Sequence, residues 1–167
     1  RAEDFLQEQV SSREGQYTGR CECFVPEETF KTFKKKGIPL DAVYLTDAQG
    51  KPFPPELWEN QFVLLKADQS LRKTHLGRVC QEKIVPLAYK KSRPYGVEPR
   101  NAGQYFLQEA LMMPPDKIPL VIVKGMAGTA KTFYSLAAGL EKVLNRTTKE
   151  YRRILISRPN AQFDSDI

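Results

Sequence analysis

The residues best suited to chemistry lie between positions 125 and 132, where small residues precede a lysine and a threonine. The segment matches the pattern G-x-x-x-x-G-K-[ST] at every fixed place but one, and it consists of Gly125, Met126, Ala127, Gly128, Thr129, Ala130, Lys131 and Thr132. Small residues let backbone N–H groups surround phosphate oxygens, while the lysine reaches the outer phosphates and the hydroxyl ligates Mg²⁺. The segment therefore predicts a phosphate-binding loop for ATP with Mg²⁺, in which Lys131 and Thr132 are catalytic and Thr132 is the metal ligand.

Ala130 occupies the place where the pattern expects glycine. If the backbone must be left-handed there, alanine costs roughly 1–2 kcal/mol. The dipole of the helix that opens at Lys131 does not depend on this side chain, so we expect the loop to survive. Replacing Ala130 by glycine is therefore expected not to reduce nucleotide affinity.

The segments on either side of the loop have the character that such a loop requires. Residues 118–123 form a short apolar run that is typical of a buried parallel strand, and residues 153–156 predict a second apolar strand. Residues 131–144 predict a helix, whose buried side is expected to carry Phe133, Leu136, Ala137, Leu140 and Leu144. This order predicts one βαβ unit, and a glycine-containing turn without a ligand is the weaker alternative.

A further helix is predicted over residues 101–113, upstream of the loop. Asn101 is its candidate N-cap, and two prolines end it. Its buried face is expected to contain Tyr105 or Phe106, Leu107, Ala110 and Leu111. Residues 91–100 contain two prolines that disfavour helix at the residue before them, so this segment predicts a linker. The linker divides the chain into residues 1–90 and residues 101–167.

Residues 1–90 predict a small, mostly β domain of the α+β class. Strands are expected at 17–25, 60–66, 71–80 and 83–89, helices at 1–12 and 27–36, and a loop at 47–55. The second helix places Phe30 and Phe33 on one face and ends at Gly37, with Lys34, Lys35 and Lys36 in its last turn. The ordinary explanation of this lysine run is that positive charge in a last turn complements the helix dipole. The alternative is that the lysines contact nucleic acid.

Composition and charge exclude several classes of protein. Hydrophobic residues make up 41% and charged residues 28%, so a core can form. The formal net charge is +6, with 12 basic and 7 acidic residues in positions 91–167, which suits an anionic partner such as nucleotide or nucleic acid.

Neither a secretory signal nor an apolar run of membrane-spanning length is found, so no membrane partner is expected. Cys21, Cys23 and Cys80 are a poor disulfide framework, which indicates reduced thiols in a cytoplasmic protein. The chain does not begin with methionine, so we expect a fragment of a longer protein.

Three motifs in order resemble the PhoH-like family of phosphate-starvation-inducible P-loop ATPases. They are residues 95–104 (YGVEPRNAGQ), the loop at 125–132, and residues 154–159 (ILISRP). The resemblance covers residues 94–167 well. Residues 1–90 are similar, more loosely, to the connector that follows a PIN ribonuclease domain in longer members of the family. The sequence contains no cluster of acidic residues that would form a PIN active site.

The resemblance implies a fold and a set of binding residues. The fold would be α/β, namely the N-terminal half of a P-loop NTPase (RecA-like) parallel sheet, preceded by a small β-rich α+β connector domain. Asn101 and Gln104 would read adenine, as in superfamily one helicases, with an N-cap asparagine and a solvated glutamine as the alternative. The predicted nucleotide-binding set also includes Phe133. Arg158 would contact RNA, with pairing to a nearby aspartate as the alternative.

The resemblance also implies an activity for the parent protein. In the family, the Walker B carboxylate and the group that positions the attacking water lie beyond Ile167. We therefore expect the parent to be an ATPase acting on RNA, as a helicase or a nuclease-linked enzyme, and a possible homo-oligomer. These 167 residues are expected to hydrolyse ATP weakly or not at all.

Two other interpretations remain open. Residues 1–90 could be an RNA-binding or protein-interaction module beside a non-functional loop. A metal-binding module could form around Cys21, Cys23, His75 and Cys80, which are suitable ligand types at an unfamiliar spacing.

Overall fold

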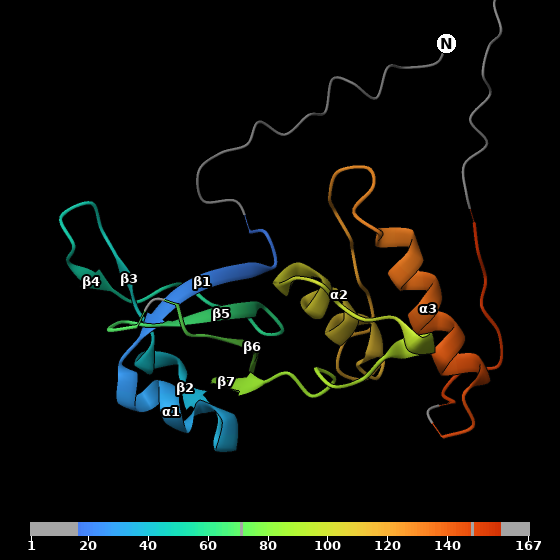
Figure 1. The fold of residues 1–167 in the computed structure, drawn as a ribbon, viewed down its shortest axis with the longest axis horizontal. Helices are drawn as coiled ribbons and strands as arrows, with labels where there is room; N and C mark the ends of the chain where they lie inside the picture. The colour runs from blue at the N-terminus through green and yellow to red at the C-terminus, as the bar shows by residue number, and fades with distance from the viewer. Residues whose placement is uncertain (1–16, 71, 148, 158–167) are drawn as a thin grey trace, which may run out of the picture. The chain divides into compact units, whose positions relative to one another are not determined.

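The computed structural model describes residues 17–70, 72–147 and 149–157. The chain divides into two compact units, the first ending at Pro86 and the second beginning at Leu87 (Figure 1). The helix predicted over residues 1–12 and the predicted RNA contact at Arg158 lie outside the described residues. No helix in the described part of the chain is long and apolar enough to cross a membrane.

The first unit is built on a mixed sheet of five strands. In spatial order these are β1 (Arg20–Val25), β5 (Phe62–Ala67), β6 (Thr74–Cys80), β7 (Lys83–Pro86) and β2 (Ile38–Pro39). β1 pairs with β5 in parallel, and the remaining pairs are antiparallel. The four strands that the sequence predicts in this region are confirmed, although their ends shift by up to three residues. The predicted loop at 47–55 is flanked and partly occupied by a small antiparallel ladder of β3 (Leu45–Thr46) and β4 (Pro52–Phe53).

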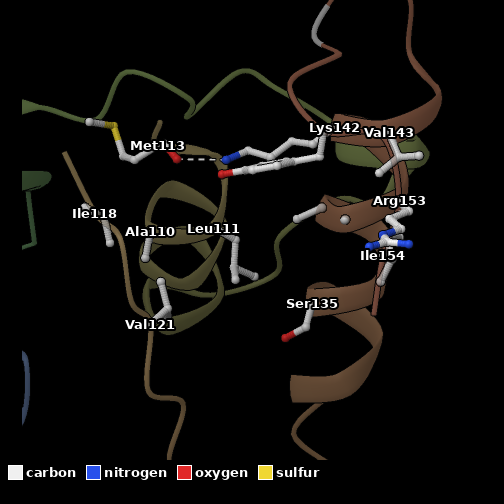
Figure 2. A pocket seen from close by; sticks show the side chains of 13 residues that line it. Ala110, Leu111, Met113, Ile118, Val121, Ser135, Lys142, Val143, Arg153 and Ile154 are labelled. Atoms are coloured by element: carbon white, nitrogen blue, oxygen red, sulfur yellow. Dashed lines mark hydrogen bonds between the residues drawn. The ribbon is translucent and has the colours of Figure 1, made fainter. Parts of the chain in front are cut away.

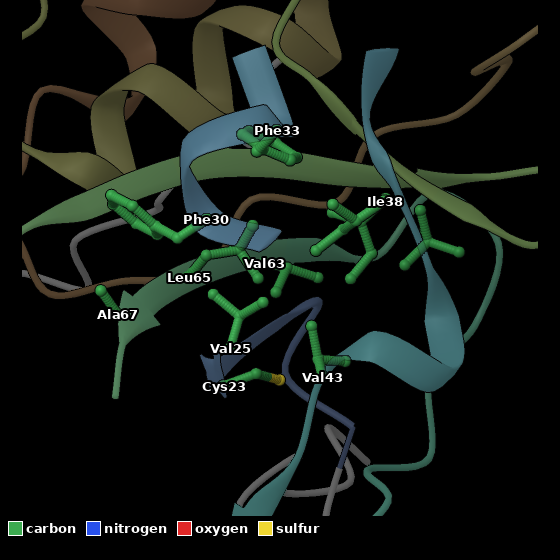
Figure 3. Close-up of a cluster of buried hydrophobic side chains, with 11 residues drawn as sticks. Cys23, Val25, Phe30, Phe33, Ile38, Val43, Val63, Leu65 and Ala67 are labelled. Carbon is green, nitrogen blue, oxygen red and sulfur yellow. The ribbon is translucent and has the colours of Figure 1, made fainter. Parts of the chain in front are cut away.

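Helix α1 (Glu27–Lys36) has the bounds that the sequence predicts. It ends at Gly37, whose φ of 71° and ψ of −172° are open only to glycine, and whose N–H donates to the Phe33 carbonyl oxygen. Phe30 and Phe33 are buried against the sheet, as predicted. A short 3₁₀ turn, η2 (Leu40–Ala42), follows β2. Figure 3 shows the resulting core, which consists of Cys23, Val25, Phe30, Phe33, Ile38, Val43, Val63, Leu65, Ala67, Val79 and Ile84.

The second unit contains helices α2 (Ala102–Met112) and α3 (Lys131–Leu144) and a 3₁₀ turn, η3 (Pro94–Gly96). Both helices form where the sequence predicts them. The buried residues of α2 include Phe106 and Ala110, as predicted, whereas Leu107 and Leu111 are only half-buried. Together with the sheet of the first unit, these helices give the chain an α/β character.

Polar side chains of α2 and α3 hold the segment that precedes them. The Glu109 carboxylate, which is 1% exposed, accepts hydrogen bonds of 2.7 Å from the N–H groups of Ala88 and Tyr89. The Gln108 side-chain amide donates to the carbonyl oxygen of Tyr89 at 2.7 Å and to that of Ser92 at 2.9 Å. Residues 88–92 are thereby attached to α2, although the sequence predicts a linker from residue 91.

The strands predicted at 118–123 and 153–156 are not formed in the described residues, which corrects the expected βαβ unit. Leu120, Ile122 and Leu155 are 74%, 76% and 80% exposed. A parallel strand exists only beside a neighbour that accepts its N–H groups, and the described part of the second unit contains no strand ladder. An apolar run is therefore necessary for such a strand but does not suffice.

The buried face of α3 also differs from the prediction. Phe133, Leu136 and Leu144 are 59%, 38% and 57% exposed. Of the predicted face, only Ala137 is fully buried. The buried positions of α3 are Tyr134, Ala137, Ala138 and Lys142. Small residues at 137 and 138 let the helix approach its neighbours closely, so this stripe packs inward and the larger apolar side chains face outward.

Candidate nucleotide-binding loop

The predicted phosphate loop runs directly into α3 through a left-handed turn. Gly128 has a φ of 78°, and Ala130 has a φ of 58° and a ψ of 23°. The glycine expected at position 130 is thus replaced by alanine at a place where the backbone is left-handed. The alanine costs roughly 1–2 kcal/mol there, yet the turn retains its conformation.

Backbone donors at the start of α3 are left available by this turn. Ala130 is the N-cap residue of α3, and no side chain caps the helix. Among the described residues, no backbone N–H from 126 to 132 donates to a backbone carbonyl outside the helix. The uncapped N–H groups of a first helical turn carry partial positive charge and can bind an anion.

Lys131 folds back over the loop. Its Nζ donates to the carbonyl oxygens of Gly125 at 2.7 Å and Met126 at 2.6 Å, and it lies 3.2 Å from Thr129 Oγ1. The Thr129 hydroxyl donates in turn to the Met126 carbonyl oxygen at 2.8 Å. These bonds place the ammonium beside the turn, where its charge adds to that of the helix N-terminus.

Thr132 and Phe133 complete the predicted site at the surface of α3. Thr132 is exposed on the first turn, and the ring of Phe133 meets the ring of Tyr134 edge to face, with centroids 6.2 Å apart. Within the described ranges, no group of three or more histidine, cysteine, aspartate or glutamate residues is placed to hold a metal ion. A magnesium ion here would therefore depend on Thr132 and on the phosphates themselves. The same finding gives no support to a metal site at Cys21, Cys23, His75 and Cys80.

Asn101 and Gln104 form the cap of α2. Asn101 Oδ1 accepts from the N–H of Gln104 at 3.0 Å, and Gln104 Oε1 accepts from the N–H of Arg100 at 2.7 Å. This reciprocal arrangement resembles a capping box. The N-cap interpretation of Asn101 is thus confirmed, and Gln104 contributes to the cap as well.

Tyr134 joins this cap to the phosphate loop, and the sequence reasoning missed it. Its hydroxyl donates to the Glu98 carbonyl oxygen at 2.8 Å and lies 3.2 Å from Gln104 Oε1. The side chain is 5% exposed, and burial raises the pKa of its hydroxyl. One buried residue therefore connects the first turn of α3 with the N-terminus of α2. The available signal was the spacing of Tyr134, Ala137 and Ala138 at i, i+3 and i+4.

Three curated bacterial relatives, each named Protein PhoH2, match the chain. The relative from Bacillus subtilis (strain 168) is 29% identical over 168 residues, which cover 99% of this chain and 35% of the relative. The relative from Thermobispora bispora is 39% identical over 90 residues, covering 54% of this chain and 20% of the relative. The relative from Mycolicibacterium smegmatis is 36% identical over 84 residues, covering 50% and 18%. The resemblance to the PhoH-like family is confirmed.

The chain spans about a third of the length of the Bacillus subtilis relative, and it overlaps a smaller share of the other two. No protein-family model matches it. No solved structure matches it either.

A cavity of the second unit lies between α2, α3 and the segments around residues 118 and 154. Figure 2 shows this cavity, whose volume is about 270 Å³. Its one buried cation is Lys142, whose Nζ donates to the Met113 carbonyl oxygen at 2.8 Å and pairs with Glu150 Oε2 at 3.1 Å. Most of the remaining lining is apolar. Lys142 is already neutralised, and the exposed Arg153 is the other cation of the lining. A mostly apolar cavity of this kind suits a triphosphate poorly, and the exposed loop remains the candidate site.

Proposed function

We propose that this chain is the ATP-binding part of a PhoH-like ATPase, with the nucleotide phosphates held by residues 125–132. The observation that supports this most directly is the loop itself. An uncapped helix N-terminus, a left-handed turn and the folded-back ammonium of Lys131 concentrate positive potential on one exposed segment. The parent fold would be a RecA-like P-loop sheet, in which the apolar segments 118–123 and 153–156 pair with strands outside these residues.

Each residue of the site would have a separate role in binding. Lys131 would bind the outer phosphates, and Thr132 would hold Mg²⁺, which neutralises phosphate charge when bound. Gln104 Oε1 is engaged by Arg100 and lies close to the Tyr134 hydroxyl. Its amide Nε2 would therefore donate to an adenine ring nitrogen, with Asn101 positioning it through the cap.

Isothermal titration of MgATP into the wild-type chain tests this proposal, with Lys131→Ala as the probe and Lys124→Ala as the matched control. Lys124 is an exposed lysine just before the loop, so the control removes the same charge outside the motif. A lost charge-assisted contact is expected to weaken binding by about 10- to 100-fold in Lys131→Ala. The control is expected to stay within about 3-fold of wild type. Equal losses in both variants, or no binding by the wild type, would reject the loop as the site.

A second candidate function, the binding of single-stranded nucleic acid by the first unit, is favoured by a groove beside α1. The groove is about 420 Å³ in volume and is lined by Glu27, Phe30, Lys31, Lys34, Lys73, Thr74 and His75. His75 stacks on Phe30 with ring centroids 4.1 Å apart and ring planes 13° from parallel. Three lysines thus surround the half-buried ring of His75, whereas Phe30 is only 5% exposed. One of them, Lys73, lies 3.8 Å from the Glu27 carboxylate.

This arrangement differs from the lysine run that the sequence suggested. Only Lys34 of the run lines the groove, where it is joined by Lys31 and Lys73. Basic side chains around the half-buried ring of His75 resemble the combination of positive charge and stacking surface that non-specific single-strand binding uses. Arg158, the other predicted RNA contact, remains a prediction because it lies outside the described residues.

Fluorescence anisotropy with a labelled single-stranded RNA tests the groove. The double variant Lys31→Ala/Lys73→Ala is compared with Lys51→Ala/Lys83→Ala, which removes two exposed lysines outside the groove. The groove variant is expected to bind more weakly and to lower the slope of log K against log salt by about 1.4, or roughly 0.7 for each lost phosphate contact. Equal effects of the two variants would show that only net charge matters and would reject the groove.

A further inference from the structure

Two thiols lie side by side on β1. Cys21 and Cys23 share one face of the strand, as the alternation of the sequence predicts, and their Sγ atoms are 3.4 Å apart. Cys21 is half-buried, whereas Cys23 is 1% exposed and belongs to the core shown in Figure 3. One thiol donates an S–H hydrogen bond to the other sulfur.

The two thiols have unequal acidity because of this contact. The hydrogen bond from Cys23 lowers the pKa of Cys21 to about 7, although burial and the neighbouring Glu22 act in the opposite direction. The same hydrogen bond, together with burial, raises the pKa of Cys23. Near neutral pH about half of Cys21 is thiolate, compared with roughly 3% of a free cysteine whose pKa is about 8.5. The pair therefore combines a reachable nucleophile with a protonated thiol at its side.

We propose that Cys21 and Cys23 form a peroxide-responsive thiol pair that closes reversibly into a disulfide. The Cys21 thiolate attacks one oxygen of hydrogen peroxide, which breaks the O–O bond, forms a sulfenic acid and releases hydroxide. The Cys23 sulfur then attacks the Cys21 sulfur, and the S–O bond breaks. The leaving hydroxide takes the Cys23 proton and departs as water. The hydroxide released in the first step takes up the proton that Cys21 lost to solvent when it ionised. The two sulfurs together thus lose two electrons, and the peroxide is reduced to two molecules of water.

The place of the pair in the sheet explains why such a disulfide would be reversible. Cα atoms two residues apart on a strand are separated by roughly 6.6 Å, close to the upper limit of about 6.8 Å for disulfides. Closing the bond therefore shortens β1 locally, at the positions where Cys21 and Cys23 pair with Val63 and Leu65 of β5. A strained bond of this kind is readily reduced by thiols. Closure would thus couple oxidation to loosening of the parallel β1–β5 pairing.

The test uses the 167-residue chain, fully reduced and then exposed to a small excess of hydrogen peroxide at neutral pH. The protein is then alkylated with N-ethylmaleimide. Intact mass spectrometry is expected to show that the chain has lost two hydrogens and that only one of its three thiols carries the label. Peptide mapping should place that label on Cys80, the third cysteine of the chain, which serves as the internal control. Reduction with dithiothreitol should restore three labelled thiols.

Three variants separate the steps of the reaction. Cys80→Ser is expected to form the disulfide unchanged, which excludes exchange through Cys80. Cys23→Ser should stop at the sulfenic acid on Cys21, which dimedone traps. Cys21→Ser should abolish the fast reaction, and circular dichroism would verify that it is folded. Labelling of all three thiols after peroxide, or a disulfide that contains Cys80, would overturn the proposal.

Discussion

Ala130 offers the most direct test of the loop geometry, because the same loop contains a matched alanine. Ala130 has a φ of 58°, whereas Ala127 is not among the described residues that have positive φ. Alanine-to-glycine substitution removes the same methyl group at both positions. Only at Ala130 does it also relieve a left-handed backbone.

The two substitutions should therefore have opposite signs. At Ala130, glycine recovers roughly 1–2 kcal/mol of backbone strain and loses about 0.4–1 kcal/mol through the greater freedom of the unfolded or unordered loop. The net gain is on the order of 0.5–1 kcal/mol. At Ala127 only the loss of about 0.4–1 kcal/mol applies. Because the ligand binds the ordered loop, the two variants should differ in binding free energy by about 1–2 kcal/mol, or roughly 5- to 30-fold in Kd.

Titration calorimetry with MgATP on the two variants measures this difference. Ala130→Gly is expected to bind as tightly as wild type or up to about 5-fold more tightly, and Ala127→Gly more weakly. Thermal unfolding without ligand should place the variants in the same order. If Ala130→Gly weakens binding, or if both variants change affinity in the same direction, the left-handed turn is not the binding conformation and the alignment of this loop with the phosphate-binding pattern is wrong.

Three other substitutions test contacts within the two units. Glu109→Gln removes a carboxylate oxygen that accepts a buried backbone hydrogen bond, so urea unfolding followed by circular dichroism should show a loss of about 2–4 kcal/mol, and a loss within error would contradict the role of this carboxylate. In Gly37→Ala the new Cβ would lie 2.5 Å from a backbone oxygen, so it should unfold more easily than Gly50→Ala, which has positive φ but open space; equal stabilities would refute the clash. The Lys66 ammonium, 2.8 Å from the Glu22 carboxylate, holds the pKa of Glu22 below its ordinary value. The pair therefore stabilises the fold at a pH above the ordinary pKa of Glu22, and this stabilisation is lost as the pH falls through the lowered pKa. Lys66→Met should return the Glu22 titration, followed by carbon-13 NMR, toward the ordinary pKa.

The elements of the first unit could be predicted because their signals are local. Alternation of apolar and polar residues predicts β1, a short apolar run predicts β5, and the i, i+3 spacing of Phe30 and Phe33 predicts α1. Gly37 predicts where α1 ends, since few other residues fit its backbone conformation. The bounds of α3 were predictable for the same reason. Each of these features depends on residues within a few positions of one another.

The packing of the second unit could not be predicted in this way. Helix α3 carries two stripes at helical spacing, one through Phe133 and Leu136 and one through Tyr134 and Ala137, and hydrophobicity favours the wrong one. Which stripe is buried depends on where α2 lies, and that is a tertiary property. The buried polar residues Gln108 and Glu109 were missed because their role appears only when their backbone partners are known.

The candidate site shows the same division between local and distant causes. The turn at Ala130 and the fold of Lys131 over the loop involve residues within a single stretch, so the sequence pattern could predict a loop there. The link from Tyr134 to Gln104 spans thirty positions and no short motif encodes it. Consequently the turn that leads into α3 was predictable, whereas the connection between this loop and the proposed adenine-binding residues was not.

The exposed apolar side of α3 bears on which activities these residues could support alone. Phe133, Leu136 and Leu144 face outward. Leu120 and Ile122, which precede α3 in the same unit, are exposed as well. Apolar surface of this extent is normally covered in a stable protein, and the chain spans only about a third of its Bacillus subtilis relative. We therefore expect the rest of the parent to cover it and to contribute the carboxylate that hydrolysis requires. Under the proposed function, phosphate binding would need only the loop and the N-terminus of α3. Nucleotide binding and hydrolysis should then be separable, with binding measurable in these residues and hydrolysis only when the covering part is added.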